Sequence, residues 1–512
     1  MYSRIISCTL IGIQGNIVYV EVDIRDGLPC VLMVGHLSLD VRESKERVIT
    51  AIKHIGIQIP PKKITINLSP AEIRKEGSAF DLPIAVAILS SYGYFPTPLL
   101  QHICFLGELS LNGRIRPVKG VLPMVLHAKE QGISCCVVPY ENRLEASIVE
   151  GIHLIAVHSL QQLMDCFKSE EQIKASYFIP NENRFNASFK QTKELNFKEV
   201  IGQGFAKRAA EIAAAGMHNL LLIGTPGTGK SMIASRMPSI MPILSTEESM
   251  ELTKIYSIRG ELKEEQGLMT TRPFRNPHHT ITQSALIGGG RYPMPGEISM
   301  AHKGILFLDE LAEFARGTLE VLRQPLEEKQ VWITRVNGTV IYPSDILLIG
   351  AMNPCPCGYF PDRTKCRCTS LQIRRYLGKI SRPLLERMDL IAEVSSMSYE
   401  ALEGDKIEED SQKIKERVEQ AVFRQKKRYE GLSIDYNSQL SGDDIKKFCI
   451  FDQNVKKVLR YVFEKRQWSI RTYHHVLKIA RTIADLEGSE CILEQHMIEA
   501  IAYRGLEQKY WG

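Results

Sequence analysis

Short apolar segments alternate with polar ones along residues 1–167 in a way that predicts a mixed domain of strands and helices. Residues 16–23 and 64–68 alternate apolar and polar side chains with a period of two, which is typical of half-buried strands. Residues 41–55 repeat apolar side chains at helical spacing, and residues 81–92 form an apolar helix that ends before a glycine. We therefore expect a compact α/β domain over residues 1–167.

The pattern changes twice in the rest of the chain. Residues 168–192 are polar and contain few large apolar side chains, as expected of an interdomain linker. Apolar runs of strand length recur over residues 193–395, whereas residues 396–512 are charged, helical in pattern and free of strand-like alternation. We expect an α/β core followed by a helical C-terminal domain.

Composition narrows the class of protein without identifying its activity. The 512 residues are too many for one hydrophobic core, and 44% hydrophobic with 24% charged side chains is ordinary for a soluble globular protein. No apolar run reaches the length of a membrane span, and the first residues do not resemble a signal peptide. The net charge of +5 permits binding to nucleic acid but does not argue for it. We expect a cytoplasmic protein with no membrane partner.

A glycine-rich segment after the apolar run 220–223 carries the clearest chemistry. Residues 224–231 read Gly-Thr-Pro-Gly-Thr-Gly-Lys-Ser and match the phosphate-loop pattern G-x-x-x-x-G-K-[ST] at every fixed position. The glycines let backbone N–H groups surround a phosphate, Lys230 reaches the β and γ phosphates, and Ser231 ligates Mg²⁺. The residues expected to bind a nucleoside triphosphate are Gly224, Thr225, Pro226, Gly227, Thr228, Gly229, Lys230 and Ser231.

Further polar groups follow two apolar runs of strand length. Asp309 and Glu310 come directly after residues 305–308, and a parallel strand there would deliver them to the ligand-binding edge of a sheet. We expect Asp309 to hold Mg²⁺, directly or through water, and Glu310 to polarise the attacking water. Asn353 follows the apolar run 346–352, where it either orients that water and senses the γ phosphate or serves only as a turn residue before proline.

The order of phosphate loop, Asp-Glu strand and Asn-tipped strand resembles the AAA+ ATPases, which hydrolyse ATP with Mg²⁺. Residues 272–279 (Arg-Pro-Phe-Arg-Asn-Pro-His-His), 295–299 (Pro-Gly-Glu-Ile-Ser) and 353–358 (Asn-Pro-Cys-Pro-Cys-Gly) resemble the magnesium-chelatase-like group of these enzymes. Within that group the chain resembles the ComM/YifB family over essentially its whole length. The resemblance implies an AAA+ phosphate-loop α/β core with a C-terminal α-helical lid domain.

This resemblance also implies functional residues that spacing alone does not. Arg387 matches the family's arginine finger, which reaches the γ phosphate of a neighbouring subunit. Arg471 matches the sensor-2 arginine of the helical lid, and Val200, Ile201 and Gly202 stand where this class meets adenine. An ordinary surface ion pair remains the alternative for each arginine. Because a finger needs a neighbour, the implied assembly is a homo-oligomeric ring, expected to be a hexamer.

One candidate for contact with DNA lies in the long stretch between Ser231 and Asp309. Residues 287–291 contain a run of glycines, which predicts an exposed flexible loop, and they end in Arg291. The family resemblance places an insertion in this region that faces the pore of the ring. Arg291 is therefore an expected nucleic-acid contact.

A second candidate is a predicted hairpin. Residues 331–342 alternate around Asn337 and Gly338, a pair that favours a two-residue hairpin turn. In related ATPases a hairpin at this place enters the pore and grips nucleic acid, so Arg335 and Asn337 near its tip are expected DNA contacts. Trp332 either stacks on a base or packs on the core, and we favour core packing.

Four of the twelve cysteines lie close together in the sequence. Cys355, Cys357, Cys366 and Cys368 form two C-x-C pairs, and four thiolates at this spacing can enclose a zinc ion on a short loop. A C-x-C pair is less usual at structural zinc than C-x-x-C, so four reduced thiols in a mobile loop remain the alternative. If a metal binds, we expect structural zinc with no open ligand position.

The N-terminal domain carries a second family resemblance. Residues 105–117 resemble the Lon protease domain, whose fold is of the ribosomal S5 domain-2 type. A Lon-like protease needs a serine nucleophile activated by a lysine. Ser78 is displaced from the position of that serine, and no lysine stands at Leu122 or Pro123, where one is required. We expect a Lon-protease-like domain without the Ser-Lys dyad, which binds DNA or arranges the ring instead.

The leading hypothesis is an ATP-driven ring motor on DNA, for which the family resemblance implies branch migration in natural transformation or homologous recombination. The alternatives are an ATPase subunit of a metal chelatase, a Lon-like ATP-dependent protease, and an ATP-switched regulator without motor activity. The family's chelatase subunit lacks the N-terminal domain, and a protease needs the missing dyad. Movement of a three-stranded DNA junction would separate a motor from a regulator.

Overall fold

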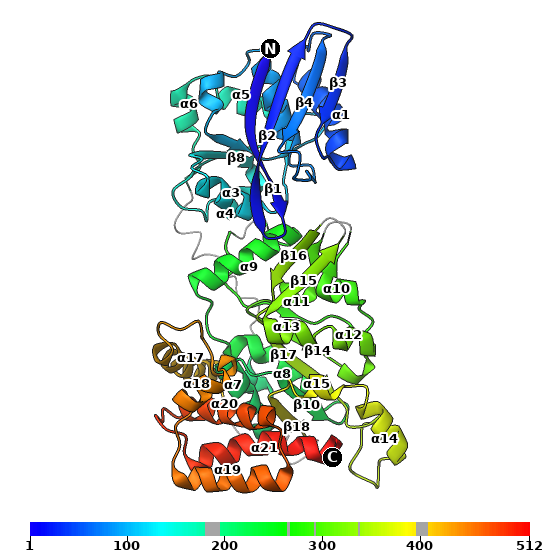
Figure 1. The fold of residues 1–512 in the computed structure, drawn as a ribbon, viewed down its shortest axis with the longest axis vertical. Helices are drawn as coiled ribbons and strands as arrows, with labels where there is room; N and C mark the ends of the chain where they lie inside the picture. The colour runs from blue at the N-terminus through cyan, green and yellow to red at the C-terminus, as the bar shows by residue number, and fades with distance from the viewer. Residues whose placement is uncertain (180–194, 264–266, 291–292, 336–337, 396–407, 512) are drawn as a thin grey trace. The chain divides into compact units, whose positions relative to one another are not determined.

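The chain folds into two compact units, which are drawn in Figure 1. The first comprises Met1–Lys190 and Thr246–Met269, and the second comprises Gln191–Ser245 and Thr270–Gly512. The sequence places residues 246–269 within the expected core of residues 193–395, but the structure groups them with the first unit. This computed structural model describes the chain outside residues 180–194, 264–266, 291–292, 336–337, 396–407 and 512.

The first unit is built on a mixed seven-stranded sheet in the order β3-β4-β2-β1-β5-β8-β9. β1 and β2, the two long strands in dark blue in Figure 1, pair antiparallel along their whole length. Buried and partly exposed positions alternate along β2, with Val18, Val20 and Val22 fully buried, as the period of two predicts. The strands are β1 (Tyr2–Ile11), β2 (Gln14–Arg25), β3 (Cys30–Val34), β4 (Lys63–Ser69), β5 (Ile103–Phe105), β8 (Cys135–Pro139) and β9 (His153–Val157).

Helices cover this sheet, and a short hairpin of β6 (Glu108–Leu109) and β7 (Ile115–Arg116) adjoins it. α2 is buried along its entire length because it packs on β1 and β2 and is covered by α1. The expected linker begins inside this unit, since α6 buries Ile173 in its core. The helices are α1 (Leu39–His54), α2 (Asp81–Ser91), α3 (Val121–Glu130), α4 (Arg143–Ala146), α5 (Leu160–Cys166), α6 (Glu170–Ala175) and α9 (Thr246–Arg259).

α9 joins the first unit by packing on α3. The backbone N–H of Gly120 donates to the carbonyl of Ser257 over 3.0 Å, and the Ser257 hydroxyl donates to the buried carboxylate of Glu145 over 2.5 Å. Burial raises the pKa of Glu145, although the hydrogen bonds from Ser257 and Asn142 oppose that shift. Polar contacts inside an apolar interface hold α9 in place, so its attachment is specific.

The second unit is built on a five-stranded parallel sheet in the order β11-β14-β17-β10-β18. Alternate side chains of β10 enter two different hydrophobic clusters, with Leu220 and Leu222 on one face and Leu221 and Ile223 on the other. Both faces are therefore covered, as is usual for a parallel sheet. The strands are β10 (Leu220–Gly224), β11 (Phe274–Arg275), β14 (Ile305–Leu308), β17 (Leu347–Met352) and β18 (Leu390–Val394).

The C-terminal part of this unit is helical, with α19, α20 and α21 stacked in one layer in orange and red in Figure 1. One hydrophobic cluster continues from the sheet through α7 into these helices. This confirms the expected mixed α/β class with a parallel sheet and a helical C-terminal region. The helices are α7 (Gly204–Gly216), α8 (Lys230–Arg236), α10 (Gln283–Ile287), α11 (Glu297–Met300), α12 (Arg316–Glu320), α13 (Arg323–Glu328), α14 (Ser370–Leu377), α15 (Arg382–Leu385), α17 (Ser411–Arg428), α18 (Gly442–Phe448), α19 (Gln453–Arg466), α20 (Ile470–Leu486) and α21 (Glu494–Trp511).

Two small hairpins complete the second unit. β12 (Gly288–Gly289) pairs with β13 (Met294–Pro295), and β15 (Gln330–Arg335) pairs with β16 (Gly338–Pro343). Among the described helices of the whole chain, none combines the length and apolar character that a bilayer crossing requires.

Candidate nucleotide-binding site

The phosphate loop connects the buried strand β10 to α8, as the sequence pattern predicts. Gly227 (φ +76°) and Gly229 (φ +93°) adopt left-handed backbone conformations that other residues rarely tolerate. A Cβ atom on Gly224 would lie 2.3 Å from the carbonyl oxygen of Val394 on the neighbouring strand β18. Each of these three glycines is therefore required by the backbone itself, as well as by any close approach of phosphate.

The Lys230 side chain lies along this loop. Its ammonium group donates to the carbonyl oxygens of Gly224 at 2.8 Å and Thr225 at 2.9 Å, and to Oδ1 of Asn353 at 3.2 Å. Burial lowers the pKa of Lys230, while the charges of Asp309 and Glu310 act in the opposite direction. A cation is thus held next to the loop by oxygen atoms from both β10 and the end of β17.

The parallel topology explains why Asn353 and Asp309 meet the phosphate loop. β17 lies between β14 and β10, so the residues that follow these three strands emerge at one edge of the sheet. The Ser231 hydroxyl donates to Oδ2 of Asp309 over 2.7 Å, and the backbone N–H of Glu310 donates to Oδ1 of Asp309 over 2.9 Å. A hydroxyl and a carboxylate oxygen at this separation suit Mg²⁺, which prefers hard oxygen ligands.

Glu310 stands at a strained backbone position at the same edge. It adopts a left-handed conformation (φ +52°), and its carboxylate is exposed, with Oε2 3.6 Å from Nδ1 of His279. Non-glycine residues in this conformation are concentrated at functional sites. His279 belongs to segment 272–279, which resembles the magnesium-chelatase-like group, but no sequence pattern assigns it a role. It is the fold that places His279 next to Glu310.

The segment expected to meet adenine is attached to the helix that follows the phosphate loop. Arg236, at the end of α8, donates to the carbonyl of Asn196 over 3.0 Å and pairs with the carboxylate of Glu199. Val200 is buried in the core, Ile201 is exposed, and the Gly202 N–H donates to Glu408 over 2.6 Å. Residues 200–202 are therefore positioned relative to the loop, although they make no direct bond to it among the described residues.

Arg387 and Arg471 share one carboxylate partner and do not meet the phosphate loop. Both guanidinium groups contact Oε1 of Glu327 on α13, Arg387 at 2.6 Å and Arg471 at 2.7 Å. The hydrogen bond from Arg471, reinforced by Arg387, lowers the pKa of Glu327. Neither arginine is hydrogen-bonded to the phosphate loop of its own chain within the described residues. Glu327 has no sequence signature, and sequence reasoning misses it.

The two segments expected to contact DNA lie side by side. A Cβ atom on Gly289 in β12 would lie 2.7 Å from Nη2 of Arg335 in β15, and one on Gly288 would lie 2.8 Å from Cδ1 of Ile333. The Arg335 side chain is exposed near the end of its strand. Arg291 and Asn337, the other expected contacts, fall outside the described residues.

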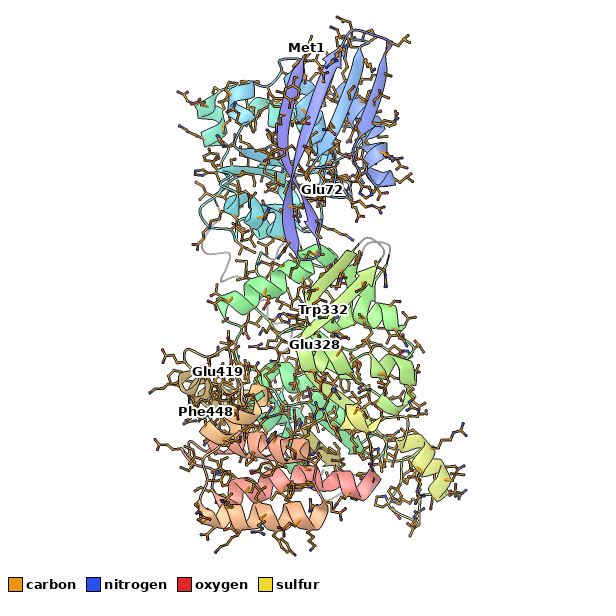
Figure 2. All side chains as sticks on the ribbon, viewed as in Figure 1. Met1, Glu72, Glu328, Trp332, Glu419 and Phe448 are labelled. Carbon is orange, nitrogen blue, oxygen red and sulfur yellow. The ribbon has the colours of Figure 1, made fainter. Side chains whose placement is uncertain are left out.

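Trp332 does not pack on the core, so that expectation is wrong. Its side chain, labelled in Figure 2, lies on β15. It is 47% exposed, whereas Val331 and Ile333 on either side of it are each only 2% exposed. The alternation of the strand explains the outcome, because neighbouring residues point to opposite faces and the two aliphatic side chains occupy the buried one.

The four clustered cysteines converge in the loop between β17 and α14. Their sulfur atoms all lie within 4.8 Å of one another, although the chain separates Cys357 from Cys366. Cys355 and Cys366 are buried, and Cys357 and Cys368 are partly exposed. The donor set therefore suits one tetrahedral metal ion.

In the N-terminal unit, Ser78 faces a carboxylate. Its hydroxyl donates to Glu108, at the start of the short hairpin β6–β7. Leu122 and Pro123 lie in α3, in the buried part of that helix. The hydrogen-bond partner of Ser78 is thus a carboxylate and not the lysine that a Lon-type dyad requires.

Comparison with known proteins identifies the family. Three family models match: "Magnesium chelatase, subunit ChlI" over residues 196–402, "Subunit ChlI of Mg-chelatase" over 20–142, and "Magnesium chelatase, subunit ChlI C-terminal" over 408–504. The chain is 39% identical over 510 residues to the uncharacterized protein YifB of Salmonella typhimurium, a match that covers 97% of this chain and 96% of that protein.

It is also 38% identical over 509 residues to the competence protein ComM of Haemophilus influenzae, covering 99% of this chain and 97% of that protein. A shorter match, 32% identical over 124 residues, joins 24% of this chain to 22% of Lon protease 2 of Bacillus subtilis. The near-complete matches and the three consecutive models agree with the geometry of the site. The chain belongs to the ComM/YifB family of magnesium-chelatase-like proteins.

Proposed function

We propose that this protein is an ATP-driven, ring-forming motor that moves branched DNA in natural transformation or homologous recombination. The observation that carries the proposal is the presence, in one compact unit, of a nucleotide site and of two adjacent hairpins that carry the expected DNA contacts. The name of the ComM relative, a competence protein, supports the biological setting.

ATP hydrolysis in this proposal uses the groups at the edge of the parallel sheet. Lys230 binds the β and γ phosphates, Ser231 and Asp309 hold Mg²⁺, Glu310 polarises the attacking water and Asn353 orients it. The hydrogen bonds of Lys230 to Asn353 and of Ser231 to Asp309 support this division of roles. His279, 3.6 Å from the Glu310 carboxylate, would help to position that group.

The ring is supported by the location of the two arginines. Arg387 and Arg471 contact Glu327 and not the phosphate loop of their own chain, within the described residues. We assign them to the triphosphate of a neighbouring subunit, where their charges would stabilise the transition state. A homo-hexamer is the expected assembly, because a closed ring gives every site a neighbour.

The DNA contacts are assigned to the paired hairpins β12–β13 and β15–β16. The exposed guanidinium of Arg335 lies next to the backbone of Gly289, and glycines allow a nucleic-acid backbone to approach closely. Exposed Trp332 on the same strand offers an aromatic face on which a base could stack. In the sequence, Arg291 lies between β12 and β13, and Asn337 lies between β15 and β16.

A proteolytic function is less well supported, although part of the chain resembles Lon protease 2. The contact of Ser78 with the Glu108 carboxylate favours an N-terminal domain without a Ser-Lys dyad. A chelatase ATPase subunit is less well supported, because the relative that matches 99% of this chain is named a competence protein.

Strand exchange on a three-stranded DNA junction tests the motor. The full-length protein with ATP and Mg²⁺ should displace the labelled strand, and the same protein with a non-hydrolysable ATP analogue should not. An ATPase-active protein that never moves the junction would point to a regulator and refute the motor.

A further inference from the structure

The four-cysteine loop has the dimensions of a zinc site. Cys355 Sγ lies 3.4 Å from Cys357 Sγ and 3.8 Å from Cys366 Sγ, and Cys357 Sγ lies 3.6 Å from Cys366 Sγ. A tetrahedral zinc ion with Zn–S bonds of about 2.3 Å holds its sulfur ligands about 3.8 Å apart. A disulfide bond would bring two sulfurs to about 2.05 Å, and an iron–sulfur cluster places several atoms between its thiolates and separates them further.

The loop supplies groups that stabilise negative charge on sulfur. The backbone N–H of Phe360 donates to Cys355 Sγ over 3.4 Å, a contact that stabilises negative charge on sulfur. Arg363, Lys365 and Arg367 are exposed on the same loop, and Arg363 donates to the carbonyl of Cys368 over 3.4 Å. Four thiolates around Zn²⁺ carry a net negative charge, which these cations balance.

Part of the loop has neither regular secondary structure nor apolar burial to hold it in place. No helix or strand is assigned between the end of β17 at Met352 and the start of α14 at Ser370, a stretch that is fully described. Residues 361–365 are all exposed, so apolar burial contributes little there. Short loops of this kind are commonly held by a structural metal.

The same loop touches the phosphate loop. Gly358 adopts a left-handed conformation (φ +84°), and a Cβ atom there would lie 2.4 Å from Cδ of Pro226. Asn353, two residues before Cys355, accepts a hydrogen bond from Lys230. The segment that carries the first cysteine pair is therefore in contact with the nucleotide site at two points.

We propose that Cys355, Cys357, Cys366 and Cys368 bind one structural Zn²⁺ ion, and that this ion holds the loop against the phosphate loop. The ion has no catalytic part, because four protein ligands leave no open coordination position. Its presence sets the affinity for ATP by keeping Gly358 against Pro226 and Asn353 beside Lys230. The zinc site does not depend on the proposed action on DNA.

Metal analysis of the full-length protein, purified without chelator, tests the site. We expect about one zinc per chain by mass spectrometry, and the visible absorption of tetrahedral cobalt thiolate when Co²⁺ replaces zinc. The double variant Cys357→Ser/Cys368→Ser should lose the metal, whereas Cys491→Ser, which alters an exposed cysteine elsewhere, should keep it. Reduced wild-type protein without metal and with four freely reactive thiols in the loop would overturn the assignment.

Nucleotide binding tests the second half of the proposal. Cys368→His keeps four ligands and should retain zinc and bind a fluorescent ATP analogue nearly as tightly as the wild type. The double serine variant should bind it roughly tenfold more weakly or worse, with an unchanged far-ultraviolet circular dichroism spectrum. Zinc-free protein that is folded and binds the analogue with wild-type affinity would show that the ion does not support the phosphate loop. DNA-junction activity has no bearing on either outcome.

Discussion

At the scale of single residues, the proposed roles separate groups that bind nucleotide from a group that activates water. Lys230, Ser231 and Asp309 are joined to their neighbours by hydrogen bonds, so their positions are set before any ligand arrives. Glu310 is different, because its carboxylate is exposed and its backbone is held in a left-handed conformation. Strain of this kind at an exposed carboxylate is consistent with a group that must point at a reacting atom.

Neutralising that carboxylate should separate binding from hydrolysis. In Glu310→Gln we expect ATP affinity to stay near the wild-type value and turnover to fall roughly 100-fold or more, because an amide cannot accept the proton of water. Steady-state turnover and equilibrium binding of a fluorescent ATP analogue measure the two effects. Glu313→Gln, which neutralises an exposed carboxylate nearby on the same segment, is the control. Equal turnover in both variants would remove Glu310 from the mechanism.

The residues that sequence alone can place are those that belong to a contiguous pattern. The phosphate loop is one uninterrupted segment, and Asp309 and Asn353 each follow an apolar run that marks the end of a strand. His279 and Glu327 cannot be found in this way, because their roles depend on partners distant in sequence that only the folded chain brings close. The prediction for Trp332 fails for a related reason: alternation defines two faces of a strand but does not say which is buried.

At the scale of elements, the hairpin β15–β16 is fixed at its base by a pair of lysines around one carboxylate. The Asp345 carboxylate lies 2.9 Å from Nζ of Lys329 and 3.0 Å from Nζ of Lys303. Burial alone would raise the pKa of Asp345, but the two lysines outweigh it and lower the pKa to about 2. The cluster links the residue before β15 to the residue that precedes Gly304 and β14, and so joins the hairpin to the sheet.

This carboxylate predicts a pH-dependent stability difference. The pKa of Asp345 is about 2 in the folded protein, against an ordinary value of 3.8, so its stabilisation is complete above pH 3.8 and is lost as the pH falls towards 2. A shift of this size corresponds to about 2 kcal/mol. Asp345→Asn should therefore lower the unfolding free energy at neutral pH, and the gap to wild type should shrink between pH 4 and pH 2. Urea midpoints measure it.

A matched control uses an ion pair of the same type on the surface. Asp443 pairs with Lys446, and its side chain is 96% exposed. Asp443→Asn should leave the urea midpoint unchanged at every pH, because exposed pairs contribute little. A constant gap between wild type and Asp345→Asn across the acidic range would contradict the assigned role of the buried pair.

The tip of the same hairpin carries the DNA prediction. Arg335→Ala should weaken DNA stimulation of ATP turnover and reduce the salt dependence of DNA binding by about one unit of the log–log slope, while turnover without DNA survives. Arg335→Lys, which keeps the charge, should lose less. Arg460→Ala, an exposed arginine on α19, serves as the control. Undiminished DNA stimulation in Arg335→Ala would reject the hairpin as a DNA contact.

Among the elements, those with local signals are predictable and those held by distant partners are not. The Asn-Gly turn predicts the hairpin, and the glycine-rich loop predicts the strand and helix around it. α6 falls within the expected linker, where large apolar side chains are few, and Ile173 is the residue of this helix that is buried. The attachment of α9 to the first unit rests on Ser257 and Glu145, which no sequence pattern pairs.

At the scale of the whole molecule, the proposed ring makes each active site the product of two chains. Glu310→Gln subunits keep the wild-type Arg387, and Arg387→Ala subunits keep the wild-type Glu310. Each variant alone should be nearly inactive. When the two variants are mixed in equal amounts, ATP turnover should be partly recovered. About one interface in four then combines a wild-type Glu310 with a wild-type Arg387 from the neighbouring subunit. Turnover of the mixture measures this, and no gain over the separate variants would mean that Arg387 does not act across an interface.

The grouping of α9 with the first unit means that the polypeptide crosses between the units three times, after Lys190, Ser245 and Met269. A backbone cut at the first crossing leaves two covalent connections, and the N-terminal fragment stays bound to α9 through α3. Any movement of one unit against the other must therefore be accommodated by three backbone connections at once. Deleting residues 1–190 would remove α3 and expose the side of α9 that packs on it. A truncation that keeps only the second unit must therefore also remove residues 246–269 and join residue 245 to residue 270.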